Sequence, residues 1–183
     1  MAVSGSGPEA AKEHPEAFVA AMRELTRRYP ARRGALLPIL TALQARRGHL
    51  ATGDLRLAAE LTGLSPAEVF SIATFYTMYR LQPAGRFPIG VCRNISCWVN
   101  GSERLVATIR DELAIGPGER TADGAFSLAE VECLGSCENA PCLEIESRYF
   151  ERVTPGRLRE LLRELRESAL DPDAAVAAAQ RTR

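Results

Sequence analysis

The sequence predicts an α+β protein in which an N-terminal helical bundle precedes a mixed α/β domain. Apolar residues recur at helical spacing from Pro15 to about Tyr79 and alternate with other residues, as in strands, after Gly85. Between these two patterns, Gln82-Pro83-Ala84-Gly85 has the composition of a linker. We therefore expect four segments: a flexible tail at 1–14, a helical domain at 15–84, an α/β domain at 85–168 and a C-terminal tail at 169–183.

The composition of the 183-residue chain is that of an ordinary soluble globular protein, with 46% hydrophobic and 25% charged residues. Its 23 basic and 23 acidic residues balance, so the chain lacks the excess positive charge that favours nucleic acid or an anionic membrane surface. We therefore expect protein partners and no nucleic acid.

The sequence also predicts a cytoplasmic location without direct membrane insertion. No segment is long and apolar enough to cross a membrane, and Met1 to Pro15 lacks the apolar core of a secretory signal. In the reducing cytosol, paired cysteines more often hold metal or do redox work than form structural disulfides. The odd count of five cysteines supports this interpretation.

Three amphipathic helices are predicted at the start of the helical domain. The first ends before Pro30, and the second accommodates Pro38 only in its first turn and stops at Gly48. The third begins at Asp54, its predicted N-cap, and runs to about Leu61. The apolar positions are Phe18, Met22, Leu25 and Tyr29 in the first helix and Leu36, Leu37, Leu40 and Leu43 in the second.

A fourth helix is predicted to begin after Ser65, a suitable N-cap, with Pro66 at the first helical position and Glu68 in the first turn. Its apolar and aromatic face is too large to leave in water, so we expect it to pack mainly on the other helices and in part on a partner protein. This face consists of Val69, Ile72, Phe75, Tyr76 and Tyr79.

The α/β domain has the predicted element order β-α-β-β-β-α. Its first strand delivers Cys92 at its end, on the face opposite the strand's apolar side chains, and its second strand runs into Cys133. The fourth strand is predicted at 149–153. The predicted apolar positions elsewhere are Phe87, Ile89 and Val91 in the first strand; Leu105, Val106, Ile109 and Leu113 in the helix; Phe126, Leu128 and Val131 in the second strand; Leu143 and Ile145 in the third; and Leu158, Leu161, Leu162 and Leu165 in the last helix.

Four of the five cysteines form two closely spaced pairs, each past the end of a predicted strand. Cys92 and Cys97 are separated by four residues, and Cys133 and Cys137 by three. A 2Fe-2S cluster needs four thiolates, two on each iron besides the bridging sulfides, and two pairs satisfy that count. Small-residue loops let backbone N–H groups turn toward the sulfurs, and Gly135 is the predicted point of closest approach. We therefore predict a 2Fe-2S cluster.

Three other uses of these cysteines remain open. Zinc also accepts four cysteines, although its paired ligands usually have two intervening residues. A catalytic dithiol would need Cys-x-x-Cys spacing, which is absent. Four buried thiols without a metal are the third alternative. Cys142 lies outside the pairs, where we expect an ordinary buried core residue rather than a ligand.

The cysteine loops and several other segments resemble a known family. They resemble, in the same order, the small thioredoxin-like ferredoxin subunit of NADH-quinone oxidoreductase, respiratory complex I. The resemblance covers about Tyr29 to Leu165. It rests on Ala73-Thr74-Phe75-Tyr76, Pro83-Ala84-Gly85, Asp123-Gly124-Ala125-Phe126, Glu132 before the second cysteine pair and Asn139-Ala140-Pro141 after it. Cys142 and His49 depart from the residues usual in the family.

The resemblance implies that the second domain is thioredoxin-like and binds a 2Fe-2S cluster through Cys92, Cys97, Cys133 and Cys137. It also implies a partner flavoprotein subunit, which binds FMN and NADH, and a larger respiratory complex on the cytoplasmic side of the inner membrane. The chain would then be an electron-transfer subunit of an oxidoreductase, with no catalytic residue and no NADH oxidation in isolation. The absence of a G-x-G-x-x-G fingerprint and of a P-loop agrees with this expectation.

Two alternative functions remain. Closely similar subunits serve NAD-linked formate dehydrogenases and hydrogenases, although Cys97-Trp98 with Gly101 looks more like the respiratory branch. An iron-sulfur transcription regulator is the remote alternative, because the segment 57–65 has the pattern that begins a helix-turn-helix. Val69 through Tyr79, the helix that would read DNA, contains no Arg, Lys, Asn or Gln, which argues against a regulator.

Overall fold

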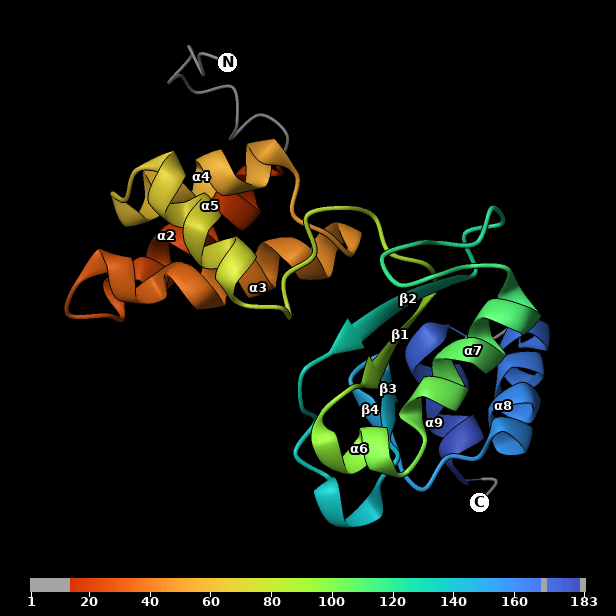
Figure 1. Ribbon diagram of the computed structural model, residues 1–183. Coiled ribbons are helices and arrows are strands. Elements are labelled where there is room, and N and C mark those ends of the chain that lie inside the picture. The colour runs from red at the N-terminus through yellow and green to blue at the C-terminus, as the bar shows by residue number, and fades with distance from the viewer. Residues whose placement is uncertain (1–13, 169–170, 182–183) are drawn as a thin grey trace. The chain divides into compact units, whose positions relative to one another are not determined.

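The structure, a computed structural model, describes residues 14–168 and 171–181. Figure 1 shows the two compact units into which the chain divides, Met1–Pro83 and Ala84–Arg183. The division falls inside the predicted linker. The predicted α+β class, a helical bundle before an α/β domain, is confirmed. Residues 1–13 of the predicted N-terminal tail, and 169–170 and 182–183 of the predicted C-terminal tail, lie outside the described residues.

The first unit is a helical bundle. Between its first two helices lies a short 3-10 turn that the sequence pattern did not predict. Aliphatic side chains from all its helices meet in one core, including the fully buried Ile39, Leu40 and Val69. The elements are α2 (Glu16–Arg27), η1 (Arg32–Ala35), α3 (Leu36–Arg47), α4 (Thr52–Thr62) and α5 (Pro66–Phe75).

Helix ends in this unit follow local sequence signals. Gly48 ends α3 with a left-handed φ of 77°. At the start of α5, Glu68 N–H donates to Ser65 Oγ, and Ser65 N–H donates back to the Glu68 carboxylate at 2.9 Å, which forms the predicted cap. The predicted N-cap of α4 is wrong. Asp54 lies within the first turn, and its carboxylate reaches back to accept the N–H of Ala51, the true N-cap, at 2.7 Å.

The aromatic face predicted for α5 is only partly packed. The helix ends at Phe75, so the residues beyond it no longer follow its face. Tyr79 is buried, and its hydroxyl donates to the Leu37 carbonyl at 2.8 Å. In contrast, Phe75 is 77% exposed and Tyr76 is 40% exposed. Packing on the other helices, expected for most of this face, is therefore found for Val69 and Tyr79, whereas Phe75 and Tyr76 form its exposed part.

His14 is buried, although the sequence placed it in the flexible tail. Its Nε2 lies 2.9 Å from Asp54 Oδ1, and both side chains are fully enclosed. Its ring also stacks on Phe18, with 5.6 Å between ring centroids. The last residue of the predicted tail thus anchors the chain to α2 and α4.

The second unit contains a four-stranded sheet with the strand order β2-β1-β3-β4. The pair β1 and β2 is parallel, whereas β1–β3 and β3–β4 are antiparallel. The predicted element order holds, with two short helical segments, α6 and η2, and a final helix, α9, added to it. The elements are β1 (Phe87–Cys92), α6 (Ile95–Val99), α7 (Ser102–Leu113), β2 (Phe126–Val131), η2 (Cys137–Asn139), β3 (Leu143–Ile145), β4 (Arg148–Phe150), α8 (Pro155–Glu167) and α9 (Pro172–Arg181).

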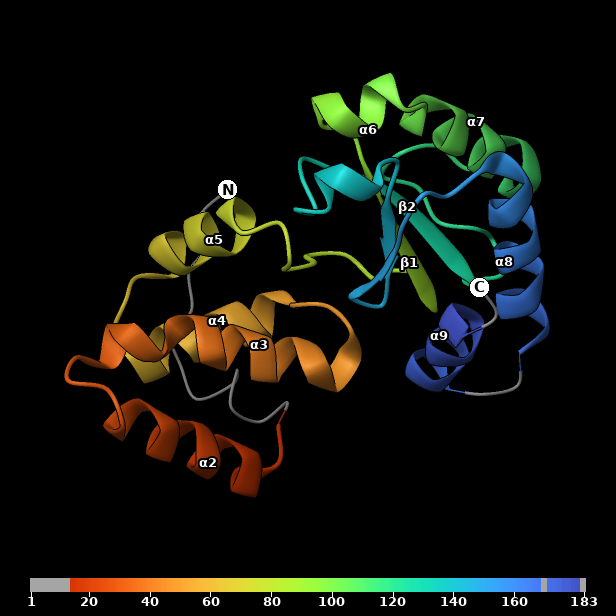
Figure 2. The ribbon, with the colours of Figure 1, turned by 90° about the horizontal axis from the view of Figure 1, so that it is seen from below.

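Helices α7, α8 and α9 lie on the same side of the sheet (Figures 1 and 2). Phe87, Ile89 and Val91 of β1 point into the core that these helices cover. The next residue, Cys92, is buried in a separate cluster with the other two buried cysteines, as the alternation of a strand requires. The sheet thus has a hydrophobic core on one face and thiols on the other, at the end of its central strand β1.

The C-terminal helix α9, in the segment expected to be a tail, is anchored to the second unit. Ala175, Val176 and Ala179 of α9 are buried in the core of the second unit. Gln180 Nε2 also donates to the Tyr149 carbonyl at 2.7 Å. The described residues of α9, which lie in the segment expected to be a C-terminal tail, are therefore packed on the second unit, because small side chains allow close packing of the helix.

Candidate metal centre

The ends of β1 and β2 bring the two predicted cysteine pairs to one edge of the sheet. The strands are parallel, with Cys92 opposite Val131, so the loops that follow them leave the sheet at the same edge. Arg93 N–H donates to the Val131 carbonyl at 2.9 Å. The Ser96 hydroxyl donates to the Cys137 carbonyl at 2.8 Å. These hydrogen bonds hold the first cysteine loop against the second.

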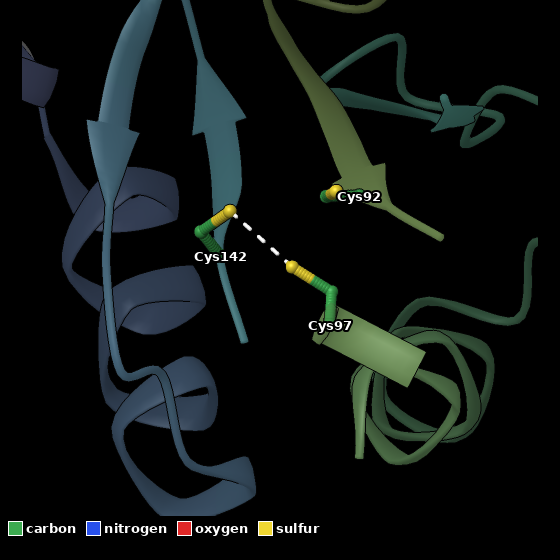
Figure 3. A group of neighbouring side chains, drawn as sticks. All are labelled: Cys92, Cys97 and Cys142. Carbon is green, nitrogen blue, oxygen red and sulfur yellow. Dashed lines mark hydrogen bonds between the residues drawn. The ribbon is translucent and has the colours of Figure 1, made fainter. Parts of the chain in front are cut away.

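Three buried thiols meet at this edge, and one of them is not a predicted ligand. The sulfurs of Cys92, Cys97 and Cys142 lie within 4.8 Å of one another (Figure 3). Cys92 ends β1, Cys97 lies in α6, and Cys142 immediately precedes β3. The Cys97 and Cys142 sulfurs are in direct contact, 3.5 Å apart. Each of the three residues is only 1% exposed.

The second predicted pair lies on the surface of the loop after β2. Cys133 and Cys137 are exposed, and their sulfurs are 4.0 Å apart. Gly135 N–H donates to the Cys133 sulfur at 3.4 Å. The neighbouring Cys133 thiol raises the pKa of Cys137, and negative charge on Cys97 and Cys92 adds to this effect.

Cys142 is buried, as the sequence suggested, but its contact with the first cysteine pair was missed. The contact follows from the pairing of β3 with β1, in which Val91 lies opposite Leu143. One residue further along, the Cys92 N–H donates to the Cys142 carbonyl at 3.2 Å. The adjacency of β1 and β3 is a long-range property, and no local sequence signal indicates it.

The loop between Cys92 and Cys97 is partly helical rather than an irregular loop of small residues. Asn94 caps α6, and its side-chain oxygen accepts the Ile95 N–H at 2.9 Å. The single turn of helix carries Cys97 into the interior and leaves Trp98 on the surface, 52% exposed. The short helix thus sets the direction of the Cys97 side chain.

The three buried thiols differ in their tendency to ionise. Burial alone disfavours the Cys92 thiolate, but the N–H groups of Asn94 and Leu134 and the two neighbouring thiols outweigh burial, so the pKa of Cys92 is lowered. Burial raises the pKa of Cys97 despite a hydrogen bond from the Cys142 N–H. Burial and the adjacent sulfurs raise the pKa of Cys142 strongly. Cys92 is therefore the thiol that the site best stabilises as an anion.

A cavity of about 420 Å³ adjoins the Cys92 end of β1. Its lining includes Cys92, Trp98 and three acidic residues, Glu103, Glu130 and Glu132. Glu132 also pairs with Arg93 across the two cysteine loops, at 3.0 Å between Nη2 and Oε1. The surroundings of the buried thiols are thus polar and open on one side, whereas the thiols themselves are enclosed.

The donor set has the chemistry of an iron-sulfur site. Thiolates are the terminal ligands of iron in such clusters, and backbone N–H groups aimed at the sulfurs stabilise negative charge. Here the N–H groups of Asn94, Leu134 and Gly135 are directed at cysteine sulfurs. The residues present therefore fit a cluster of this class. The structure does not gather the four predicted ligands into one tight group, since the compact trio contains Cys142 instead of the second pair.

Comparison with known proteins decides the family. A family model described as thioredoxin-like [2Fe-2S] ferredoxin matches residues 22–166. The chain belongs to this family. The thioredoxin-like class predicted for the second domain is thereby confirmed, and the predicted 2Fe-2S cofactor agrees with the family.

The relatives of this ferredoxin-family chain include proteins named as NADH-quinone oxidoreductase subunits. The chain is 42% identical over 139 residues to the NADH-quinone oxidoreductase E subunit 2 of Rhizobium meliloti, and the match covers 76% of this chain and 83% of the relative. It is 40% identical over 148 residues to NADH-quinone oxidoreductase subunit 2 of Thermus thermophilus, covering 79% and 82% respectively. The resemblance to this kind of subunit is therefore confirmed.

Other similar proteins are considerably longer than this chain. The NADH-quinone oxidoreductase E subunit of Mycobacterium bovis is 40% identical over 144 residues, and the match spans 79% of this chain but only 57% of the relative. The crystal structure of an air-oxidized NAD+-reducing [NiFe]-hydrogenase is similar at 26% identity and a TM-score of 0.63, over 72% of this chain and 23% of that one.

Among the described helices, none has the length and apolarity needed to cross a bilayer.

Proposed function

We propose that this ferredoxin is the electron-transfer subunit of an NADH:quinone oxidoreductase and holds one 2Fe-2S cluster on Cys92, Cys97, Cys133 and Cys137. The observation that carries the proposal is the meeting of both cysteine pairs at one edge of the sheet, where Ser96 ties the first loop to the second. When bound, such a cluster supplies one-electron redox chemistry.

The proposed ligands are two from each loop because a 2Fe-2S cluster takes two thiolates on each iron. Cys92 and Cys97 supply the buried pair, and Cys133 and Cys137 supply the exposed pair, with 4.0 Å between the latter two sulfurs. Cys142 is left outside this set. The N–H groups directed at Cys92 and Cys133 orient these sulfurs and stabilise their negative charge.

The proposed partner is a flavoprotein subunit that binds FMN and NADH, within a larger respiratory complex on the cytoplasmic side of the inner membrane. The named relatives support this assignment because they are subunits of NADH-quinone oxidoreductase. The chain contains no dinucleotide-binding fingerprint of its own. The exposed pair Cys133 and Cys137 also gives a partner access to one side of the site. Enzyme activity therefore belongs to the complex, and the isolated chain carries electrons without oxidising NADH.

A hydrogenase- or formate dehydrogenase-type assembly is the second candidate. The similarity to the NAD+-reducing [NiFe]-hydrogenase favours it, but the identity of 26% is lower than the 40–42% found for the respiratory relatives. A nucleic-acid-binding role has less support, because α5 offers no Arg, Lys, Asn or Gln between Pro66 and Phe75.

Purification of the full chain from its native cells tests this function. A co-purifying flavoprotein that lets NADH reduce the cluster, seen as a new electron paramagnetic resonance signal, is the expected result. The chain separated from that flavoprotein should remain oxidised when NADH is added and become reduced when dithionite is added. Reduction by hydrogen or formate through the partner would instead support the second candidate. Reduction by NADH without any flavoprotein would contradict both.

A further inference from the structure

The contact between Cys97 and Cys142 is not explained by the proposed ligand set. Their sulfurs are 3.5 Å apart in the buried cluster, although Cys142 is not one of the four proposed ligands (Figure 3). We propose that Cys97 and Cys142 form a reversible disulfide when the chain holds no cluster, which makes this pair a site of oxidative modification. The inference rests on the proposed function only in that Cys97 is a cluster ligand.

The positions of the two residues favour this bond. A disulfide has an S–S length of about 2.05 Å, so the two sulfurs must approach by about 1.5 Å. Cys97 lies on α6, a helix of only five residues flanked by loops, and Cys142 lies just before β3, outside the strand ladder. Adjustment of one or both side chains is therefore possible without breaking the pairing of β1 with β3.

The third buried sulfur is held differently. The Cys92 thiol donates to the Glu132 carbonyl, with 3.8 Å between sulfur and oxygen, and Cys92 belongs to the regular pairing of β1. Cys92 lies within 4.8 Å of both other sulfurs, so it is the natural competitor for either of them. The direct contact of Cys97 with Cys142 selects that pair over the alternatives.

Hydrogen peroxide is an oxidant of the required class. One cysteine sulfur attacks a peroxide oxygen, the O–O bond breaks, hydroxide leaves and a sulfenic acid forms. The second cysteine sulfur then attacks the sulfenic sulfur, so that the S–S bond forms, the S–O bond breaks and water leaves. In sum, two thiols lose two electrons and two protons, and one peroxide is reduced to two waters.

The disulfide has two consequences for Cys97. Oxidised Cys97 is unavailable as a thiolate ligand, so the cluster-free chain accepts no cluster until a dithiol reductant reopens the bond. The bond also intercepts the sulfenic acid before further peroxide converts it to sulfinic acid, which is not reversed by thiols. Cys142 thus protects Cys97 of the cluster-free chain from irreversible oxidation, so that reduction restores Cys97 as a ligand.

Mapping of the disulfide in the full-length chain tests the proposal. The cluster-free, fully reduced chain is treated with hydrogen peroxide, remaining thiols are alkylated, and the chain is cut with trypsin and a Glu-specific protease. The sequence separates the relevant cysteines well: cleavage after Arg93 and Glu103 isolates Cys97, and cleavage after Glu138 and Glu144 isolates Cys142. The expected product joins these two fragments, and dithiothreitol separates them.

Two variants provide the controls. Cys133→Ser should retain the Cys97–Cys142 link, since neither sulfur of the link is changed. Cys142→Ala should lose the link and accumulate Cys97 sulfinic acid at the same peroxide dose. The proposal is overturned by a wild-type map in which Cys97 stays alkylatable or is joined to another cysteine. That map needs no variant, so a folding defect in Cys142→Ala does not affect it.

A loading assay separates failure of this inference from failure of the proposed function. Ferrous iron and sulfide are added to the reduced, the oxidised and the dithiothreitol-treated chain, and bound iron and sulfide are measured. The expected result is loading of the first and third samples and loss of most loading in the second. If the reduced chain takes up no cluster, the proposed function fails whatever the map shows. Loading of an oxidised chain that carries the mapped disulfide contradicts the inference alone.

Discussion

At the residue scale, Gly135 shows how a backbone position controls the exposed cysteine pair. Its φ is +76°, in the left-handed region that other residues rarely adopt. The sequence suggested that Gly135 is needed for close approach, but an added Cβ would meet nothing within 4 Å. Glycine is therefore required at this position for its backbone conformation. This conformation directs the Gly135 N–H at the Cys133 sulfur.

We predict that Gly135→Ala destabilises the folded chain by about 1–2 kcal/mol and lowers cluster occupancy, because a Cβ in this conformation is strained. Urea unfolding and bound iron per chain measure the two effects. Gly116→Ala is the matched control, since it has no left-handed φ and its Cβ would meet Glu119 only at an ordinary 3.5 Å. Similar losses in both variants would show that the strain at Gly135 is not the cause.

Ser96 links the two cysteine loops by a single hydrogen bond to the Cys137 carbonyl. We predict that Ser96→Ala reduces stability by about 1 kcal/mol and speeds the loss of iron to a chelator, because one of the links between the two loops is lost. Ser71→Ala, at an exposed position in the helical unit, serves as control. An unchanged rate of iron loss in Ser96→Ala would exclude a tethering role.

At the scale of the element, the start of α5 gives a pH-dependent prediction. Hydrogen bonds from the Ser65 N–H and hydroxyl lower the pKa of Glu68 from 4.5. A carboxyl group whose pKa is lower in the folded than in the unfolded state stabilises the folded chain above its unfolded-state pKa. This stabilisation is lost as the pH falls through the folded-state pKa. Ser65→Ala, which removes this cap, should therefore reduce stability more near neutral pH than in acid. Thermal unfolding at pH 7 and pH 3 measures this, and a larger cost in acid would contradict it.

The docking of α9 gives a second prediction at this scale. Val176 is fully buried in the core of the second unit. Val176→Ala should therefore reduce stability by about 2 kcal/mol through the loss of two buried methyl groups. Val99→Ala makes the same change at a position that is 69% exposed and should have little effect on stability. Equal urea midpoints for Val176→Ala and the wild-type chain would argue that α9 is not docked.

Most features with local signals were predicted well, apart from the N-cap of α4, and features that depend on distant partners were not. The N-cap of α5 at Ser65 and the end of α3 at Gly48 depend on residues close in the sequence, so both appear in the structure as expected. The exposure of Phe75 depends on where α5 ends and on what the rest of the bundle covers. Burial of α9 similarly depends on α8 and β4, which its own alanine-rich sequence does not reveal.

At the scale of the whole molecule, the five cysteines all lie in the second unit, and the first unit contains none. The two pairs and their positions after strands were predictable because spacing and alternation are local properties. The neighbourhood of Cys142 was not predictable, because it arises from the antiparallel pairing of β3 with β1. The docking of a partner on exposed apolar residues of the first unit stays a prediction.

The iron and acid-labile sulfide content of cysteine variants tests the proposed ligand set most directly. The wild-type chain and Cys142→Ser should each bind two irons and two sulfides, whereas Cys92→Ser, Cys97→Ser, Cys133→Ser and Cys137→Ser should each lose most of the cluster or show an altered spectrum from oxygen ligation. A normal cluster in Cys133→Ser or Cys137→Ser, together with its loss in Cys142→Ser, would contradict the four-ligand assignment and favour the buried trio. Zinc in place of iron and sulfide would contradict the cluster itself.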